Sequence, residues 1–94
     1  MSEMKAEKVT VLGTGSWGTA LAKVLAENGH DVLMWSRVEN QAIVDEINDH
    51  HTNNTYLKEL ILPKTIKATT DLEEAIEDRE IIVVVIPTVG IRST

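Results

Sequence analysis

Cysteine is absent from this sequence of 94 residues, which excludes disulfides and thiolate chemistry and is compatible with a cytoplasmic location. No apolar run reaches about eighteen residues, so no membrane insertion is expected. The charged opening, residues 1–7, lacks the apolar core of a secretory signal and predicts a flexible leader. Basic residues are also few, because 9 Lys and Arg stand against 15 Asp and Glu, a net charge of −6. This balance argues against a nucleic-acid partner and against anionic membranes.

The histidines and carboxylates do not form a pattern that is typical of a metal centre or a hydrolase. His50 and His51 are adjacent, so their side chains diverge on a helix or a strand and do not chelate one metal together. The acidic residues between positions 73 and 78 are expected to form a solvated helix face. No metal ligand and no catalytic residue is therefore assigned within these residues.

The strongest functional signal lies between Lys8 and Gly29. A short apolar run with β-branched residues, Lys8–Leu12, predicts a buried parallel strand. It is followed at once by Gly13-Thr14-Gly15-Ser16-Trp17-Gly18 and then by a helical pattern. A strand, the spacing G-x-G-x-x-G and a helix, in that order, are typical of a dinucleotide-binding turn.

Each glycine of this turn has an expected role. Gly13 makes the tight turn, Gly15 lets a pyrophosphate approach the backbone, and Gly18 lets the helix pack closely on the strand. The helix N-terminus adds unpaired N–H groups and the positive end of its dipole, both of which favour phosphates. The alternative is a glycine-rich turn that binds no ligand.

The helix after the turn is expected to end at Gly29, which stands where a C′ glycine belongs. Its apolar face is predicted from residues at spacings of three and four, namely Trp17, Ala20, Leu21, Val24 and Leu25. The Trp17 indole either packs in the core on this face or shapes the cofactor cleft, and the sequence leaves both interpretations open.

The remaining elements predict an α/β fold. Further strands are expected at residues 32–35, 66–69 and 81–86, with Pro87 ending the last one. A helix over 39–48 presents Ile43, Val44 and Ile47 on one face. Right-handed crossovers then give a Rossmann-type, doubly wound parallel sheet with strand order 3-2-1-4, truncated at its C-terminal end.

Two segments of this fold are predicted less sharply. A short helix with Leu72, Ala75 and Ile76 on its apolar face begins after either Thr70 or Asp71, since each fits as its N-cap. The polar connection over residues 49–63 is long enough to be functional or to contain an unrecognised element. The final strand, 81–86, is the most hydrophobic run in the chain and is typical of a strand that is buried in the full sheet. Whether it stays covered in this chain is left open, and without its neighbour in the full sheet it is expected to cause self-association.

The end of the second predicted strand bears on the choice of nucleotide. NAD-selective folds place an acidic residue there, whereas this chain has Trp35, Ser36 and Arg37. Arg37 is suited to pairing with a 2′-phosphate and stacking on adenine, and Ser36 to donating a hydrogen bond to the same phosphate. NADP is therefore favoured over NAD, and the alternative is that Arg37 is a solvated surface residue.

Several stretches resemble the N-terminal part of bacterial NAD(P)-dependent glycerol-3-phosphate dehydrogenase. They are G-T-G-S-W-G-T-A-L-A from Gly13, N-G-H-D-V from Asn28, W-S-R from Trp35, and H-T-N-x-x-Y-L from His51. The resemblance runs from about Lys8 to Arg92. It departs from the family at Lys58, where proline is usual, and at Thr88-Val89-Gly90, which replaces Ser/Thr-Gln-Ala.

The resemblance implies reversible hydride transfer from NAD(P)H to dihydroxyacetone phosphate, which gives sn-glycerol 3-phosphate for glycerophospholipid synthesis. It implies that Ser16 and Trp17 contact the cofactor phosphates and that Arg37 contacts the adenosine end. The family's catalytic lysines and substrate-phosphate ligands come later in the chain. Residues 8–94 would thus be the N-terminal part of a dinucleotide-binding domain, without a substrate domain and inactive alone, from an enzyme expected to be a homo-oligomer.

Two other functions remain open at this point. One is a non-catalytic module that binds NADP(H), and a reading frame that continues past Thr94 would argue against it. The other is the N-terminal part of a ketopantoate reductase or a 3-hydroxyacyl-CoA dehydrogenase, against which the H-T-N-x-x-Y-L segment argues.

Overall fold

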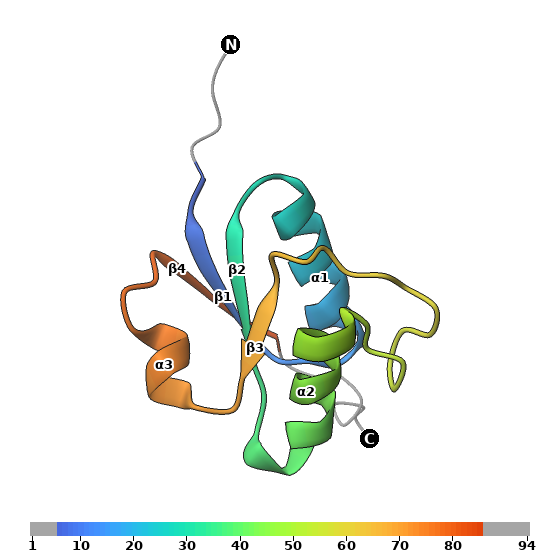
Figure 1. Ribbon diagram of the computed structural model, residues 1–94. Helices are drawn as coiled ribbons and strands as arrows, with labels where there is room; N and C mark the ends of the chain where they lie inside the picture. The colour runs from blue at the N-terminus through green and yellow to red at the C-terminus, as the bar shows by residue number, and fades with distance from the viewer. Residues whose placement is uncertain (1–5, 86–94) are drawn as a thin grey trace, which may run out of the picture.

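The computed structural model describes residues 6–85, which form a parallel sheet with helices on both faces (Figure 1). The strands are β1 (Lys8–Leu12), β2 (Asp31–Trp35), β3 (Lys67–Thr69) and β4 (Ile81–Val84). All neighbours pair in parallel, and their order is β3-β2-β1-β4. The predicted fold class and strand order are confirmed. The predicted leader lies largely outside the described residues, as do Ile86 and Pro87 at the end of the last predicted strand.

Helices α1 (Ser16–Glu27) and α2 (Gln41–His50) lie on one face of the sheet, and α3 (Leu72–Ile76) lies on the other. A single 3₁₀ turn, η1 (Val38–Asn40), leads into α2. Each strand therefore connects to the next through a helix, which is how parallel neighbours have to be joined. Among residues 6–85, no helix has both the length and the apolar character that crossing a membrane would require.

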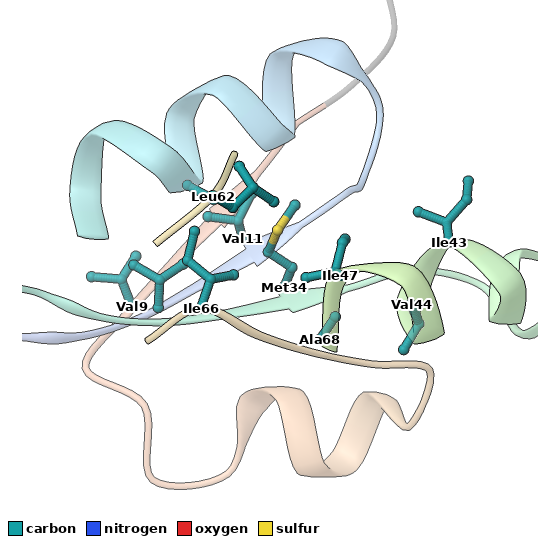
Figure 2. Close-up of a cluster of buried hydrophobic side chains, with 11 residues drawn as sticks. Val9, Val11, Met34, Ile43, Val44, Ile47, Leu62, Ile66 and Ala68 are labelled. Atoms are coloured by element: carbon teal, nitrogen blue, oxygen red, sulfur yellow. The ribbon is translucent and has the colours of Figure 1, made fainter. Parts of the chain in front are cut away.

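The core lies between the sheet and the pair α1 and α2. Side chains alternate across a strand, so Val9 and Val11 of β1 face this pair together with Met34, which is in register with Val11. Ile47 of α2 and Leu62 of the long connection complete the cluster and are almost fully buried. Figure 2 shows Val11, Met34 and Leu62 gathered between the sheet and α1. The connection after α2 thus contributes to the core.

The opposite face of the sheet is joined to α3 by polar contacts. The buried Thr10 hydroxyl donates to the carbonyl oxygen of Ala75 and accepts from Arg79 Nε at 3.0 Å. Arg79 Nη2 also donates to the carbonyl oxygens of Val9 at 2.9 Å and Asp31 at 2.7 Å. The guanidinium therefore ties the segment before β4 to β1 and β2.

The predicted apolar face of α1 is confirmed only in part, because Leu25 packs against the core but other members of that face are exposed. Trp17 is 78% exposed and Val24 is 52% exposed, whereas the fully buried positions are Gly18, Thr19 and Ala22. Small residues on this side let the helix approach β1 more closely than large side chains would allow. The spacing of apolar residues therefore identified the helix but only part of the side that packs on this sheet. Gly29 does follow the helix as predicted, since Gly29 N–H and His30 N–H donate to the carbonyls of Ala26 and Leu25.

Helix α2 begins two residues later than predicted, because η1 takes up the first turn. Its predicted face is confirmed, since Ile43, Val44 and Ile47 are all buried. β3 begins at Lys67, one residue after the predicted start, although Ile66 is buried just before it.

The two caps proposed for α3 are resolved in favour of Asp71. Its carboxylate accepts a hydrogen bond from Glu74 N–H at 3.3 Å. Only Ala75 of the predicted apolar face is buried, while Leu72 and Ile76 are exposed. The acidic residues from 73 to 78 are exposed as predicted, but α3 ends at Ile76, so Glu77 and Asp78 follow the helix and do not belong to its face.

The last strand is uncovered in the described residues, which answers the point that the sequence left open. Ile81, Ile82 and Val84 are all exposed, with Val84 at 61%. Within the part of the chain that the structure describes, β4 pairs with β1 alone, so it forms one edge of the sheet. A strongly apolar sequence reports that a strand is suited to burial, and the neighbouring layers decide whether burial occurs.

Candidate functional site

The turn between β1 and α1 needs two of its glycines for structural reasons. Gly13 has a φ of +147°, a conformation that side chains rarely adopt, and its N–H donates to the Trp35 carbonyl at 2.9 Å. At Gly18, an added Cβ would stand 2.6 Å from the Gly13 carbonyl oxygen. The helix therefore rests directly on the backbone of the turn, as predicted for these two positions.

Gly15 has no such structural reason to be glycine. Its φ of −75° and ψ of −167° are extended values open to any residue. An added Cβ would meet only the Tyr56 ring, at 4.0 Å, which is ordinary contact. Among the described residues, therefore, nothing requires a glycine at this position.

Gly15 lines a cleft of about 790 Å³ at the carboxyl ends of the strands. The cleft lies where the strand order reverses between β1 and β4, the usual ligand position in an open α/β sheet. All seven residues predicted to bind cofactor line it, and they are Gly13, Gly15, Ser16, Trp17, Gly18, Ser36 and Arg37. Its other lining residues are Leu12, Thr14, Trp35, Asn40, Tyr56, Val84 and Val85. The structure thus brings the two halves of the predicted site into one space.

The N-terminus of α1 forms one wall of the cleft. Trp17 belongs to the first turn of the helix and lines the cleft while staying largely exposed. The interpretation of Trp17 as a core residue is therefore wrong, and the interpretation as a cleft residue remains. Ser16 is also exposed, and its hydroxyl makes a long contact of 3.4 Å to the Tyr56 carbonyl.

The end of β2 and the start of η1 form another wall. Arg37 is exposed there and precedes η1, so its charge is available to a ligand in the cleft. Ser36 is only 4% exposed, and its oxygen accepts from Thr14 Oγ1 at 2.9 Å and Asn40 Nδ2 at 2.8 Å. A hydroxyl also carries one hydrogen to donate, so Ser36 can still serve a ligand while it joins two walls.

No three His, Asp or Glu side chains within residues 6–85 are grouped closely enough to hold a metal ion. The cleft presents instead backbone N–H groups, a helix N-terminus and a guanidinium, and these are groups that bind phosphates.

The sequence matches a known family over nearly its whole length. The sequence model of the family described as NAD-dependent glycerol-3-phosphate dehydrogenase N-terminus matches residues 8–94. This chain belongs to that family. The resemblance inferred from the sequence is confirmed.

Individual relatives agree with this assignment. The chain is 59% identical over 87 residues to the glycerol-3-phosphate dehydrogenase (NAD(P)+) of Enterococcus faecalis, which covers 93% of this chain and 25% of the relative. It is 52% identical over 85 residues to the enzyme of the same name from Streptococcus uberis, again 25% of the relative. The chain thus spans about a quarter of the length of these curated relatives.

Solved structures extend the agreement to three dimensions. The glycerol-3-phosphate dehydrogenase of Coxiella burnetii superposes with a TM-score of 0.78 at 41% identity, covering 88% of this chain and 25% of that one. The enzyme from Plasmodium falciparum gives a TM-score of 0.78 at 35% identity, covering 92% of this chain and 26% of that one. The fold of residues 6–85 is therefore that of the N-terminal part of these dehydrogenases.

Several residues of the site in this family member were not predicted as site residues. Tyr56 reaches the cleft from the long connection after α2, and Asn40 reaches it from η1. Asn53, 1% exposed, lies behind the glycine turn and donates to the Thr14 carbonyl at 2.8 Å. The H-T-N-x-x-Y-L segment, which carried part of the family resemblance, contains both Asn53 and Tyr56 and was the signal that could have found them.

Proposed function

We propose that this chain is the cofactor-binding part of an NAD(P)-dependent glycerol-3-phosphate dehydrogenase, which interconverts dihydroxyacetone phosphate and sn-glycerol 3-phosphate. The observation that carries the proposal is Gly15, which lines the cleft and which no contact among residues 6–85 requires to be a glycine. The family membership and the names of the relatives, which act with NAD(P)+, support the same cofactor.

The residues of the cleft fit the two ends of such a cofactor. The turn at Gly13 and Gly15 would let the pyrophosphate lie against the backbone, next to the N–H groups of Ser16 and Trp17 at the start of α1. Arg37 and Ser36 would hold the adenosine end, where the guanidinium pairs with a 2′-phosphate. When bound, the nicotinamide supplies or accepts the hydride.

These assignments favour NADP over NAD. The candidate positions after β2, from Trp35 to Arg37, carry no carboxylate that would accept hydrogen bonds from an unmodified ribose. In the full enzyme, we expect a small phosphate-bearing substrate, a cytoplasmic homo-oligomer and no nucleic-acid partner. The chain of 94 residues by itself should bind cofactor without reducing dihydroxyacetone phosphate, because the resemblance places the catalytic lysines later in the sequence.

The test is a titration of the chain with NADPH and with NADH, followed by tryptophan fluorescence. Both tryptophans, Trp17 and Trp35, line the cleft, so bound nucleotide should quench them. We expect tighter binding of NADPH, and we expect Arg37→Ala to weaken NADPH by about tenfold or more while NADH changes little. Lys64→Ala is the matched control, because Lys64 is also an exposed cation but lies outside the cleft.

Two results would count against the proposal. If neither nucleotide binds the unmodified chain, the cofactor assignment is wrong for this chain. If NADPH binds equally well to the unmodified and Arg37→Ala chains, the cleft binds nucleotide but Arg37 does not select it.

A further inference from the structure

We infer that Asn53 is a positioning residue for the cofactor, which fixes the direction of the backbone N–H that Gly15 offers to the pyrophosphate. The inference rests on the proposed function, since it concerns the same cleft. Asn53 itself does not line the cleft. It acts on the glycine turn from behind, through the peptide bond between Thr14 and Gly15.

The contacts that hold this peptide are buried and short. Asn53 Nδ2 donates to the Thr14 carbonyl oxygen at 2.8 Å and to Thr19 Oγ1 at 2.9 Å. Thr19 Oγ1 donates in turn to the same Thr14 carbonyl, at 3.2 Å. All three residues are buried, with Asn53 at 1% exposure. The Thr14 carbonyl is thus held on the inner side of the turn by two donors from different parts of the chain.

The geometry of the peptide bond between Thr14 and Gly15 determines where the N–H of Gly15 points once the Thr14 carbonyl is held. A trans peptide is planar, and its C=O and N–H point in opposite directions. When the Thr14 carbonyl is held toward Asn53, the N–H of Gly15 must point away from Asn53. Gly15 is the N-cap of α1 and lines the cleft, so its N–H stands at the positive end of the helix, where phosphates bind. A flipped peptide would present a carbonyl oxygen to the phosphate instead.

Asn53 is itself firmly placed by its own backbone. Its carbonyl oxygen accepts from Leu57 N–H at 2.8 Å and from Tyr56 N–H at 3.2 Å, which closes the turn that brings Tyr56 to the cleft. The buried Oδ1 atom of Asn53 has no hydrogen-bond donor among the described residues. Asn53 therefore contributes to the turn through its two N–H donors.

The same network reaches the adenosine side of the cleft. Thr14 Oγ1 donates to Ser36 Oγ, which also accepts from Asn40 Nδ2. Thr14, a residue of the glycine turn, is therefore bonded to Asn53 through its carbonyl and to Ser36 at the end of β2 through its hydroxyl. The Asn53 amide thus helps to hold the two walls of the cleft in one arrangement.

The first test compares Asn53→Asp with Asn54→Asp in the chain of 94 residues. Asn53→Asp removes both N–H donors and places a carboxylate oxygen against the Thr14 carbonyl. Asn54→Asp adds the same charge one residue away on the surface, and its carboxylate can still accept from Glu59 N–H as the amide does. We expect Asn53→Asp to weaken NADPH and NADH by a similar factor of about tenfold or more, because both carry the pyrophosphate. Asn54→Asp should leave both affinities unchanged.

A second variant guards against the possibility that Asn53→Asp does not fold. Thr19→Val keeps the shape of the side chain and removes only the hydroxyl that bridges Asn53 and Thr14. We expect it to weaken both nucleotides by about fivefold, the effect of one hydrogen bond. Circular dichroism establishes that each variant is folded before its affinity is measured.

A third readout separates positioning from a general loss of structure. In amide NMR spectra of the cofactor-free chain, the variants should shift the resonances of Gly15 and Ser16 and leave those of β3 in place. If the variants fold, their Gly15 resonances do not shift and their nucleotide affinities are unchanged, the inference about Asn53 is overturned while the proposed function stands. If the unmodified chain binds neither nucleotide, the proposed function fails and this inference fails with it.

Discussion

The comparison of Gly15→Ala with Gly18→Ala separates what the glycine turn does for folding from what it does for a ligand. The two residues lie three positions apart: Gly15 is the N-cap of α1, and Gly18 lies in the first turn of that helix. The structure predicts opposite outcomes for the same methyl group. Gly18→Ala should lower stability, while Gly15→Ala should lower cofactor affinity.

The magnitude for Gly18→Ala follows from its neighbours. The new Cβ would stand 2.6 Å from the Gly13 carbonyl oxygen and 3.0 Å from the Gly13 carbonyl carbon, both of them backbone atoms. Relief requires a shift of the helix or the turn, and overpacking of this kind costs about 1–3 kcal/mol. Alanine returns part of that through its higher helix propensity, up to about 1 kcal/mol. We expect the free energy of unfolding to fall by about 1–2 kcal/mol in total. Each kcal/mol corresponds to a fall of about 4–8 °C in Tm for a domain of this size.

Gly15→Ala should leave the free energy of unfolding nearly unchanged. Its backbone conformation is open to alanine, and its new Cβ reaches only the Tyr56 ring at 4.0 Å. Alanine is a poorer N-cap than glycine but reduces the entropy of the unfolded chain, and these effects of about 0.5–1 kcal/mol oppose each other. In the cleft, however, the methyl group stands where a pyrophosphate would lie, so NADPH should bind at least about tenfold more weakly.

Stability is measured by urea unfolding followed by far-UV circular dichroism, and affinity by the fluorescence titration described above. The reasoning would be refuted if Gly15→Ala destabilised the fold as much as Gly18→Ala and left NADPH affinity unchanged. In that case the turn would be a structural feature without a ligand, and the functional role of Gly15 would be withdrawn.

Three further predictions concern the fold. Ile47→Ala should lower the free energy of unfolding by about 2–5 kcal/mol, because Ile47 is fully buried. Ile61→Ala, at an exposed site, should change that free energy by less than about 0.5 kcal/mol, and urea unfolding compares the two variants. Asp71→Ala should destabilise by about 0.5–2 kcal/mol and Thr70→Ala by less, since Asp71 caps α3; equal thermal shifts would contradict that assignment. The exposed edge of β4 should make the chain self-associate, and Val84→Lys should reduce this; a monomer mass independent of concentration in sedimentation would rule it out.

The sequence by itself determined the features that depend on local chemistry. Apolar strands, a helical pattern and three glycines at fixed spacing predicted the order β3-β2-β1-β4 and a nucleotide cleft between Gly13 and Arg37. The strand order is confirmed, because it rests on a few neighbouring residues together with the fixed handedness of the connections between parallel strands. The predicted site residues line one cleft, and nucleotide binding there stays a prediction.

The tertiary structure decided which surfaces meet. The face of α1 that packs on the sheet is the one with Gly18 and Ala22, because close approach to β1 required small side chains that carry no hydrophobic signal in the sequence. The exposure of β4 likewise depended on its place at the edge of the sheet and not on its composition.

The arrangement behind the glycine turn was also decided only in three dimensions. Asn53 stands 39 positions from Thr14 along the chain, in a connection whose sequence is polar and irregular. A hydrogen bond between such distant residues forms because the fold brings them together and excludes water from the space between them. The spacing of residues along the chain predicts neither condition. The sequence therefore specified a turn that could bind a phosphate, and the fold supplied the buried amide that fixes how this turn is presented.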